Sequence, residues 1–388
     1  MRILYLTFYF EPDLCAGSFR NTPLSKELAK QFKDGEVKVI TTQPNRYSSY
    51  SKTADSEENI GNLTIKRINV RKHKNGFIDQ IITFRSYYKG VLNEIKSEDF
   101  DLVFASSSRL FTAYLGYKIA RKKNIPLYLD IRDLFTDTMK DVMKISVIKK
   151  PVLFCLNKIE KKVFSYASHI NLISGGFNSH VTKYKIKNTS NYSHGIDQEF
   201  INAESKISNN RDYYVITYAG NIGDGQGLHK IIPDAAQKLG DKYQFRIIGD
   251  GGKASQLREL IKNKNLSNVK LEDPVGRKEL FKIYFKSDFL FLHLNNYEAF
   301  KKVLPSKVFE LGAFNKPLIA GVDGFAKEFI VNNLDNVVLF QPGNVEELVK
   351  NLKTYRYKTF RRSDFTREFN RDKINREMAS SILSYIRK

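Results

Sequence analysis

The stretch that most constrains the fold is residues 304–313, which lie between two apolar runs. The run before it, Phe289 to Leu294, and the run after it, Pro317 to Ala320, are short and continuous, as strands buried on both faces are. Within the stretch, Ser306 is expected to cap a short helix that begins at Lys307. This order of strand, loop, helix and strand is typical of an open parallel sheet, which binds ligands at the carboxyl ends of its strands.

Two charged residues lie on the first turn of that helix. Lys307 and Glu310 are three residues apart and therefore share one face. Free N–H groups at a helix N-terminus favour anions. A capping box would need its glutamate at position 309, which leaves Glu310 free for another partner. The alternative is an ordinary solvated ion pair.

The second half of the chain carries two glycine clusters, each directly after an apolar strand. Tyr214 to Ala219 is followed by Gly220 and Asn221, and Phe245 to Ile248 is followed by a second cluster, Gly249-Asp250-Gly251. Backbone N–H groups in such loops can face a phosphate or a base. With the helix from Ser306 to Glu310 in the same sheet, these loops predict one ligand crevice, and Arg277 lies in the loop after the next strand.

The first half begins with a β-α-β pattern of its own. A strand from Arg2 to Phe8 is followed by a loop that contains Gly17 and by a helix from about Ser18 to Phe32. Gly17 lies where a glycine lets a ligand approach the backbone, and Arg20 follows on the first helical turn. A plain turn with a surface arginine is the alternative.

Two further residues follow a predicted strand at its carboxyl end. Arg132 and Asp133 come after the run from Leu127 to Ile131, where a parallel sheet places its chemistry. A structural ion pair is the alternative for them. Asp99 and Asp101 spell D-x-D, which holds a cation in metal-dependent sugar transferases, but here the pair precedes its strand. We interpret it as a connection between a helix and a strand and expect no metal site.

Charge and length restrict the class of protein. The chain has 388 residues, enough for two domains, and a net charge of +22, which implies an anionic partner such as a nucleic acid, an anionic lipid or a phosphorylated substrate. Residues 140–164 alternate lysine with large apolar residues around Pro151, which indicates a helical pair, split at this proline, at an anionic membrane surface. A helical pair packed on the sheet with a solvated basic face is the alternative. Five more basic residues are expected to share the membrane surface: Lys66, Arg67, Arg71, Lys72 and Lys74.

Other features exclude several classes. Because no apolar run approaches the roughly 20 residues that cross a bilayer, we expect a cytoplasmic protein that is peripheral at the inner face of the plasma membrane. The two cysteines, Cys15 and Cys155, are far apart and lack metal spacing, so neither a disulfide framework nor a zinc site is expected.

Four motifs resemble those of the family-4 retaining glycosyltransferases, over nearly the whole chain. They are Tyr218-Ala219-Gly220-Asn221, Ile248-Gly249-Asp250-Gly251, Pro305-Ser306-Lys307 with Glu310, and His194-Gly195-Ile196-Asp197. The P-S-K-x-x-E spelling is similar to that of bacterial O-antigen and capsule transferases. The resemblance implies an α/β GT-B fold with two Rossmann-like doubly wound domains facing a central cleft. It implies an acceptor-binding domain over residues 1–195, a nucleotide-sugar-binding domain over 196–370, and a C-terminal helix over 371–388 that returns to the first domain.

The resemblance also implies roles for individual residues. Glu310 matches the second glutamate of the family's E-x7-E motif, which accepts from the ribose hydroxyls, whereas Lys302 replaces the first. Asn221 and Gln226 stand where the family has a diphosphate-binding arginine and lysine, which leaves Lys307 and Arg277 as the cations. Arg132 takes the place of an acceptor-side histidine, so it and Asp133 are the catalytic candidates. The binding candidates are Gly17, Arg20, Gly220, Asn221, Gly249, Asp250, Gly251, Arg277, Ser306, Lys307 and Glu310.

The function implied by the resemblance is transfer of a hexosyl or N-acetylhexosaminyl group from a nucleoside-diphosphate sugar, expected to be a UDP-sugar. The acceptor would be a polyprenyl-diphosphate-linked or glycan acceptor in cell-surface glycan synthesis, with no metal or other cofactor. One alternative is a UDP-sugar 2-epimerase of the same fold. Another is a basic, non-enzymatic nucleic-acid-binding protein, which would not explain glycines after successive strands and lacks an RNA-binding or helix-turn-helix spelling. We therefore expect no nucleic-acid partner.

Overall fold

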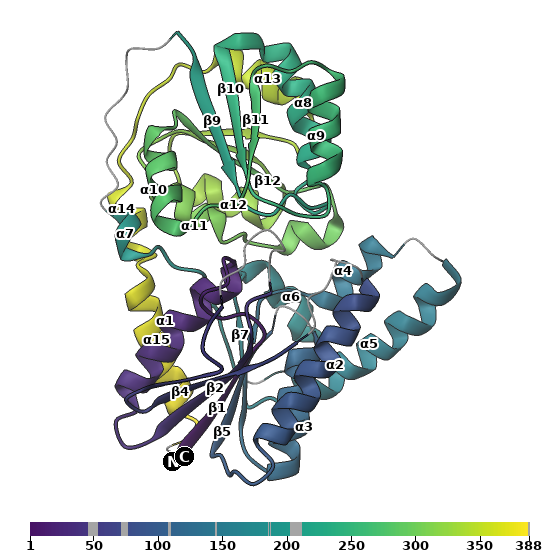
Figure 1. Ribbon diagram of the computed structural model, residues 1–388, viewed down its shortest axis with the longest axis vertical. Coiled ribbons are helices and arrows are strands. Elements are labelled where there is room, and N and C mark those ends of the chain that lie inside the picture. The colour runs from purple at the N-terminus through teal and green to yellow at the C-terminus, as the bar shows by residue number, and fades with distance from the viewer. Residues whose placement is uncertain are drawn as a thin grey trace. The chain divides into compact units, whose positions relative to one another are not determined.

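The computed structural model describes residues 1–45, 53–70, 77–107, 110–143, 146–184, 186, 188–201 and 212–386. The chain forms two compact units, of which unit 1 comprises Met1–His194 with Asp372–Lys388 and unit 2 comprises Gly195–Arg371. Each unit is a mainly parallel sheet with helices on both faces (Figure 1), which confirms the predicted α/β fold class. No helix in the described part of the chain is both long and apolar enough to cross a membrane.

The sheet of unit 1 has the strand order β3-β4-β2-β1-β5-β6-β7-β8, and in the described part of the chain only its pairing of β3 with β4 is antiparallel. Its strands β1, β5 and β6 are buried along almost their whole length because helices cover both of their faces. The strands are β1 (Arg2–Thr7), β2 (Glu36–Thr42), β3 (Glu57–Ile60), β4 (Leu63–Ile68), β5 (Leu102–Ser107), β6 (Leu127–Ile131), β7 (His169–Leu172) and β8 (Thr189–Ser190).

Two groups of helices cover this sheet. Helix α1 and the C-terminal helix α15 lie on one face, and α2, α3 and α5 lie on the other (Figure 1). Met378 and Ile382 of α15 are buried in one hydrophobic cluster with Leu24 and Leu28 of α1. The helices are α1 (Ala16–Gln31), α2 (Phe77–Glu94), α3 (Leu110–Lys123), α4 (Phe135–Val142), α5 (Ser146–Tyr166), α6 (Asn178–Val181) and α15 (Arg371–Leu383).

The prediction that Pro151 splits the basic helical pair is wrong. Helix α5 begins at Ser146 and continues through Pro151, and α4 ends earlier, at Val142. Pro151 is the sixth residue of α5, so it removes one backbone hydrogen bond, to the carbonyl of Val147, without ending the helix.

Unit 2 has a six-stranded, wholly parallel sheet with the order β11-β10-β9-β12-β13-β14. The chain moves outward from β9 to β11 and then returns to place β12 on the other side of β9. The loops after β9 and β12 therefore diverge, which creates the switch point where open α/β sheets bind ligands. The strands are β9 (Tyr214–Ala219), β10 (Tyr243–Ile248), β11 (Val269–Glu272), β12 (Phe289–His293), β13 (Leu318–Gly321) and β14 (Val337–Phe340).

Separate hydrophobic clusters fill the two sides of this sheet. One contains Ile216 and Phe245 with residues of α8 and α13, and the other contains Leu290 and Leu292 with residues of α11 and α12. The helices of unit 2 are α7 (Gln198–Ile201), α8 (Leu228–Leu239), α9 (Ala254–Asn263), α10 (Arg277–Lys286), α11 (Lys307–Gly312), α12 (Phe325–Asn333), α13 (Val345–Thr354) and α14 (Ser363–Glu368).

Candidate functional site

The glycine loops after β9 and β10 pack directly against each other. A Cβ atom on Gly249 would lie 1.8 Å from the carbonyl oxygen of Gly220, and one on Gly251 would lie 2.7 Å from that of Ile222. Two backbone hydrogen bonds join the loops, from Gly220 N to Ile248 O and from Ile222 N to Asp250 O, both at 2.9 Å. The close approach therefore gives these glycines a structural role beside any contact with a ligand.

The polar side chains of these loops are neutral or engaged locally. The Asn221 side-chain amide donates to Gln226 Oε1 at 2.7 Å, so the residues that replace the family's cations bind each other. The Asp250 carboxylate accepts from the backbone N–H of Gly251 at 2.7 Å, and the Tyr218 hydroxyl donates to the Asn221 carbonyl, also at 2.7 Å. Lys253, at the end of the loop after β10, is the one cation of these two loops, so a second positive charge must come from another element.

Helix α11 supplies that charge. The Lys307 ammonium group donates to Glu310 Oε1 at 2.8 Å and to the Tyr284 hydroxyl at 3.0 Å. A Cβ atom on Gly220 would lie 3.8 Å from Lys307 Cε, so the lysine lies beside the loop after β9. Ser306 precedes the helix, but its side chain makes no capping hydrogen bond, which corrects the expected cap.

The charge of Glu310 is set by burial and by two cations. Burial raises the pKa of this carboxyl, but Lys307 and Arg277 outweigh that effect and hold the pKa below its ordinary value. Glu310 is therefore a carboxylate at neutral pH and an acceptor for hydroxyl groups.

Arg277 is not a free cation. Its guanidinium group forms ion pairs with Asp197 and Glu199, and it lies over the ring of Phe200 at 4.8 Å from the centroid. A phosphate contact would compete with both carboxylates. Arg277 thus influences this site through the electrostatic field that it exerts at Glu310. Its two ion pairs do not favour the direct contact with phosphate that the sequence predicted.

In unit 1, Gly17 and Arg132 lie against each other. A Cβ atom on Gly17 would be 2.8 Å from Arg132 Nη1, so the glycine allows the guanidinium group to lie over the first turn of α1. That turn contains no acidic residue. Arg132 Nε is buried and has no hydrogen-bond partner among the described residues, and burial lowers the pKa of the guanidinium group although Asp130 opposes this. An unsatisfied cation at a helix N-terminus favours an anion.

Arg20 has a different role from the one expected. Its guanidinium group forms two hydrogen bonds of 2.8 Å to Asp130 and donates to the carbonyl oxygen of Ser193 at 2.8 Å. Arg20 is 3% exposed and Asp130 is fully buried. Arg20 is therefore an interior residue that ties α1 to β6, which corrects the prediction of a nucleotide contact.

Asp133 is a titratable group close to neutral pH. Burial raises the pKa of its carboxyl to about 6, and the Thr138 hydroxyl donates to Asp133 Oδ1 at 3.1 Å. A carboxyl group with this pKa can accept a proton near pH 7. Asp133 is thereby suited to act as a general base.

The D-x-D pair lies at the amino end of β5. Asp99 pairs with Lys123, and Asp101 accepts from the backbone N–H of Arg2. Among the described residues, no group of three or more histidine, cysteine, aspartate or glutamate side chains is arranged to hold a metal ion.

Sequence reasoning missed two residues of these sites. Tyr284 is fully buried and binds Lys307 across from α11, but its position in an ordinary amphipathic helix carries no signal. Asp130 could have been noticed, because it is a single acidic residue inside the apolar strand Leu127–Ile131. It also accepts from Ser106 and Asn171, so it is a hydrogen-bonding centre of unit 1.

Residues 199–364, which make up most of unit 2, match the family model described as glycosyl transferases group 1. An Escherichia coli K12 protein named as a colanic acid biosynthesis glycosyl transferase, WcaI, is 27% identical over 142 residues. This match covers 36% of the chain and 34% of that relative, so it spans about a third of the relative's length.

Solved structures resemble the chain over nearly its whole length. Sucrose-phosphate synthase from Thermosynechococcus elongatus has a TM-score of 0.69 at 12% identity, covering 99% of this chain and 96% of that one. The Anabaena protein HepE, solved with UDP-glucose, has a TM-score of 0.68 at 15% identity, covering 99% and 100%. At such identities the likeness establishes the fold. The chain has the GT-B fold, most of its second unit matches the group 1 glycosyl transferase model, and it resembles transferases of surface-polysaccharide synthesis.

Proposed function

We propose that this protein is a retaining glycosyltransferase that moves a sugar from a UDP-sugar to a polyprenyl-diphosphate-linked or glycan acceptor in cell-surface glycan synthesis. The observation that carries the proposal is the meeting of the Gly220 and Gly249 loops with Lys307 of α11 at the switch point of unit 2. Support for the donor class comes from HepE, a protein of similar fold whose structure was solved with UDP-glucose.

The donor would be held by charge and by hydroxyl contacts. Lys307 would neutralise the diphosphate, whose negative charge grows as the bond between the sugar and the phosphate breaks. The Glu310 carboxylate would accept from the ribose hydroxyls. Because Asn221 and Gln226 are neutral and bind each other, Lys307 would be the principal cation of unit 2 in this role.

Unit 1 would contribute an anion-binding group and a base. The Arg132 guanidinium group lies over the first turn of α1, has one unsatisfied donor, Nε, and would bind a phosphate group of the substrate. Asp133 would accept the proton that the acceptor hydroxyl loses as its oxygen bonds to the sugar carbon. In a retaining transfer the acceptor attacks from the face that the diphosphate leaves, so positioning and leaving-group stabilisation supply most of the rate.

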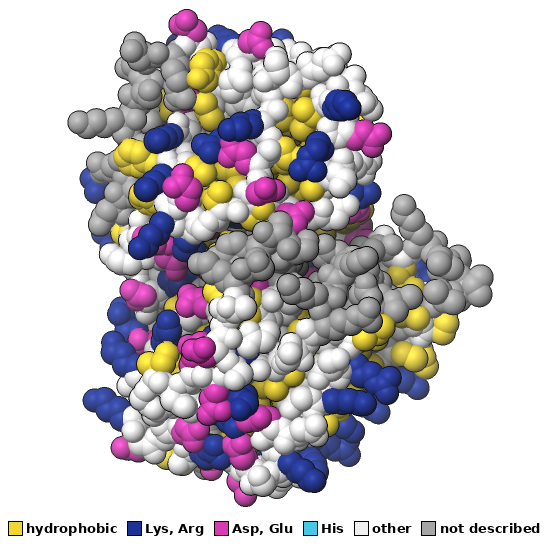
Figure 2. Space-filling model, viewed as in Figure 1, with side chains coloured by type: hydrophobic (Ala, Val, Ile, Leu, Met, Phe, Trp, Pro, Cys, Tyr) yellow, Lys and Arg dark blue, Asp and Glu magenta, His cyan; other side chains and the backbone are white. Residues whose placement is uncertain are grey.

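Support for a membrane-linked acceptor comes from the outer face of α5. Four exposed lysines lie on it, and the only acidic residue of the helix, Glu160, is buried and bonded to His180. Phe154 is 60% exposed, with the Lys158 ammonium group 4.4 Å from its ring centroid. Figure 2 shows lysine and arginine side chains gathered with hydrophobic ones along this side of unit 1. The exposed lysines are Lys150, Lys158, Lys161 and Lys162.

Of the five further basic residues that the sequence assigned to the membrane surface, the two that the structure describes do not contribute an open positive charge. Lys66 pairs with Glu57, and Arg67 is buried and paired with Glu58, so neither is an open basic group. Arg71, Lys72 and Lys74, like residues 144–145 of the basic stretch, lie outside the described residues.

A panel of nucleotide sugars tests the proposal. Thermal shift with UDP-, GDP-, ADP- and dTDP-sugars should identify a UDP-sugar that raises the melting temperature. That donor should then be consumed only when an acceptor is added, and in the presence of EDTA. Turnover of the UDP-sugar without acceptor would favour the 2-epimerase alternative, and no stabilisation by any nucleotide sugar would contradict the proposal.

A further inference from the structure

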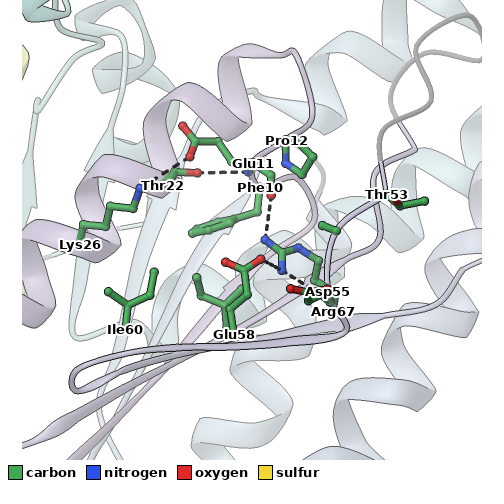
Figure 3. A pocket seen from close by; sticks show the side chains of 12 residues that line it. Phe10, Glu11, Pro12, Thr22, Lys26, Thr53, Asp55, Glu58, Ile60 and Arg67 are labelled. Carbon is green, nitrogen blue, oxygen red and sulfur yellow. Dashed lines mark hydrogen bonds and ion pairs between the residues drawn. The ribbon is translucent and has the colours of Figure 1, made fainter.

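A pocket of about 410 Å³ opens in unit 1 between α1 and the β3–β4 hairpin (Figure 3). Its walls are the loop after β1 at residues 10–12, the side chains of Thr22 and Lys26 on α1, residues 53–55, and the inner face of the hairpin. Small-molecule pockets in proteins commonly span about 300–1,000 Å³. The pocket is therefore large enough for one or two sugar rings, and none of the residues discussed above as donor or catalytic candidates lines it.

One wall of the pocket carries a fixed hydrogen-bond donor. Arg67 is 5% exposed, and its guanidinium group is held by Glu58, by the carbonyl oxygen of Asp55 at 2.9 Å and by that of Glu11 at 2.9 Å. Its Nε atom is buried and has no hydrogen-bond partner among the described residues. Arg67 lines the pocket, so its guanidinium group places a fixed positive charge in this wall.

Hydrogen-bond acceptors lie beside this donor. The carboxylates of Glu11, Asp55 and Glu58 line the pocket together with two cations, Lys26 and Arg67, so its formal charge is −1. Lys26 lies 3.7 Å from Glu11, and both side chains are about half exposed. Hydroxyl groups can donate to these carboxylates and carry no charge of their own.

The remaining walls are apolar. Phe10, Ile60 and Ile65 line the pocket, and Ile60 is 51% exposed although it lies on a strand. The C–H face of a sugar ring would cover this exposed isoleucine, which is favourable at roughly 25 cal/mol per Å² of apolar surface.

We propose that this pocket binds an uncharged, hydroxyl-bearing sugar unit, and that its carboxylates exclude acidic sugars. The inference rests on the proposed function, in which this sugar would belong to the acceptor. A uronic acid or a phosphorylated sugar would place its negative charge beside the carboxylates of Asp55, Glu58 and Glu11, whereas a neutral sugar meets acceptors for its hydroxyls.

The pleat of β3 provides a matched control. Glu58 and Ile60 face the pocket, whereas Glu57 lies on the opposite face of the same strand, where it pairs with Lys66. Asp55→Lys and Glu57→Lys raise the net charge by the same amount from positions two residues apart. Only Asp55→Lys changes the charge inside the pocket.

Saturation-transfer NMR with methyl glycosides tests the inference on the full chain. We expect methyl glucoside, methyl galactoside or methyl N-acetylglucosaminide to bind, and methyl glucuronide to bind about tenfold more weakly because like charges repel. Ile60→Ser should weaken the neutral glycoside about threefold or more, since it removes the apolar wall. Asp55→Lys should bring the glucuronide to at least the affinity of the neutral sugar, and Glu57→Lys should change neither.

Two results would overturn the inference: equal binding of neutral and acidic glycosides, or affinities that Ile60→Ser and Asp55→Lys leave unchanged. Calorimetry with UDP on the same proteins separates this failure from that of the proposed function. If UDP binds and no glycoside binds, the sugar-binding role of the pocket is rejected and the proposed function stands. If Ile60→Ser loses affinity for UDP, the pocket serves the donor, and the inference is again rejected. Absence of UDP binding in the unchanged protein would reject the proposed function.

Discussion

At the scale of single residues, the same side chains serve the fold and the candidate site. Gly249 and Gly251 carry no side chain because another loop lies against them, and Lys307 is oriented by Glu310 and Tyr284 before any ligand binds. Such preorganisation lowers the entropy lost when a ligand binds. It also means that a substitution at this site can lower the stability of the fold as well as the affinity for a ligand, so a test must measure both.

Substitutions of Lys307 and of Glu310 should weaken the binding of different ligands. Lys307→Ala should weaken UDP binding by about 1.5–3 kcal/mol, the range for a charged hydrogen bond, and leave uridine nearly unchanged because uridine has no phosphate. Glu310→Ala should weaken both ligands, because both have the ribose hydroxyls. Calorimetry on the folded variants measures this, and unchanged UDP affinity in both would remove the site.

Asp133 should produce an acid limb in the pH profile. Its pKa is raised to about 6, so the carboxyl is protonated below that pH and a base only above it. We expect kcat/KM to rise with pH through about 6, and Asp133→Asn to lower it and remove this limb. Thr138→Val, which removes a hydrogen bond to the carboxylate, should move the limb to higher pH. An unchanged limb in Asp133→Asn would assign it to another group.

At the scale of secondary-structure elements, α5 illustrates how one helix can have two unrelated faces. Its inner face places Glu160 against His180, Tyr184 and Thr136, and its outer face presents lysines and Phe154. Buried carboxylates need such partners because burial without them is costly. The inner network therefore removes the helix's one negative charge from its exposed surface.

That outer face should bind anionic membranes. We expect the protein to bind vesicles containing phosphatidylglycerol and to be released as salt rises, because charges are screened over about 10 Å at 0.1 M ionic strength. Changing Lys158, Lys161 and Lys162 to Glu should abolish binding in a co-sedimentation assay. The same changes at Lys262, Lys350 and Lys353 of unit 2 alter the net charge equally and should have a much smaller effect. Equal binding to neutral and anionic vesicles would contradict the electrostatic part.

At the scale of the whole chain, the C-terminal segment from Asp372 belongs to unit 1 together with Met1–His194. Tyr385, close to the C-terminus, lies against His169 of β7, with His169 Nδ1 3.0 Å from its hydroxyl oxygen. The imidazole also stacks on Tyr128 at 4.4 Å. Burial lowers the pKa of His169 to about 4, so the ring is neutral when the chain is folded.

Stability should therefore fall in acid. The unfolded chain takes up this proton below about pH 6.5 and the folded chain only below about pH 4, so the free energy of unfolding should fall by up to about 3 kcal/mol between these values. In His169→Gln, urea unfolding should show a slope against pH that is smaller by about one proton. His180→Gln is the comparison. Asp137 and Glu160 raise the pKa of His180, so the stability that its protonated ring gives the folded chain is lost as the pH rises. Equal slopes for His169→Gln and the unchanged protein would contradict the assignment.

The sequence by itself determined the features that depend on near neighbours. Continuous apolar runs became buried parallel strands, glycines after strands became the loops of the switch point, and the residues from Ser306 to Glu310 formed a strand-to-helix turn. These follow from periodicity and backbone stereochemistry, which act over a few residues. The sequence also showed which charges were available, but not where they would be used.

Only the tertiary structure decided the partners of those charges. Arg20 meets Asp130 across 110 residues, and Arg277 meets Asp197 and Glu199 from about 80 residues away, so two expected ligand contacts became internal ion pairs. Arg132, by contrast, kept an unsatisfied Nε donor, and the pocket at Arg67 appeared between elements that are distant in the sequence. A charge acts over several ångströms in space regardless of sequence separation, so its role is set by what folding brings beside it.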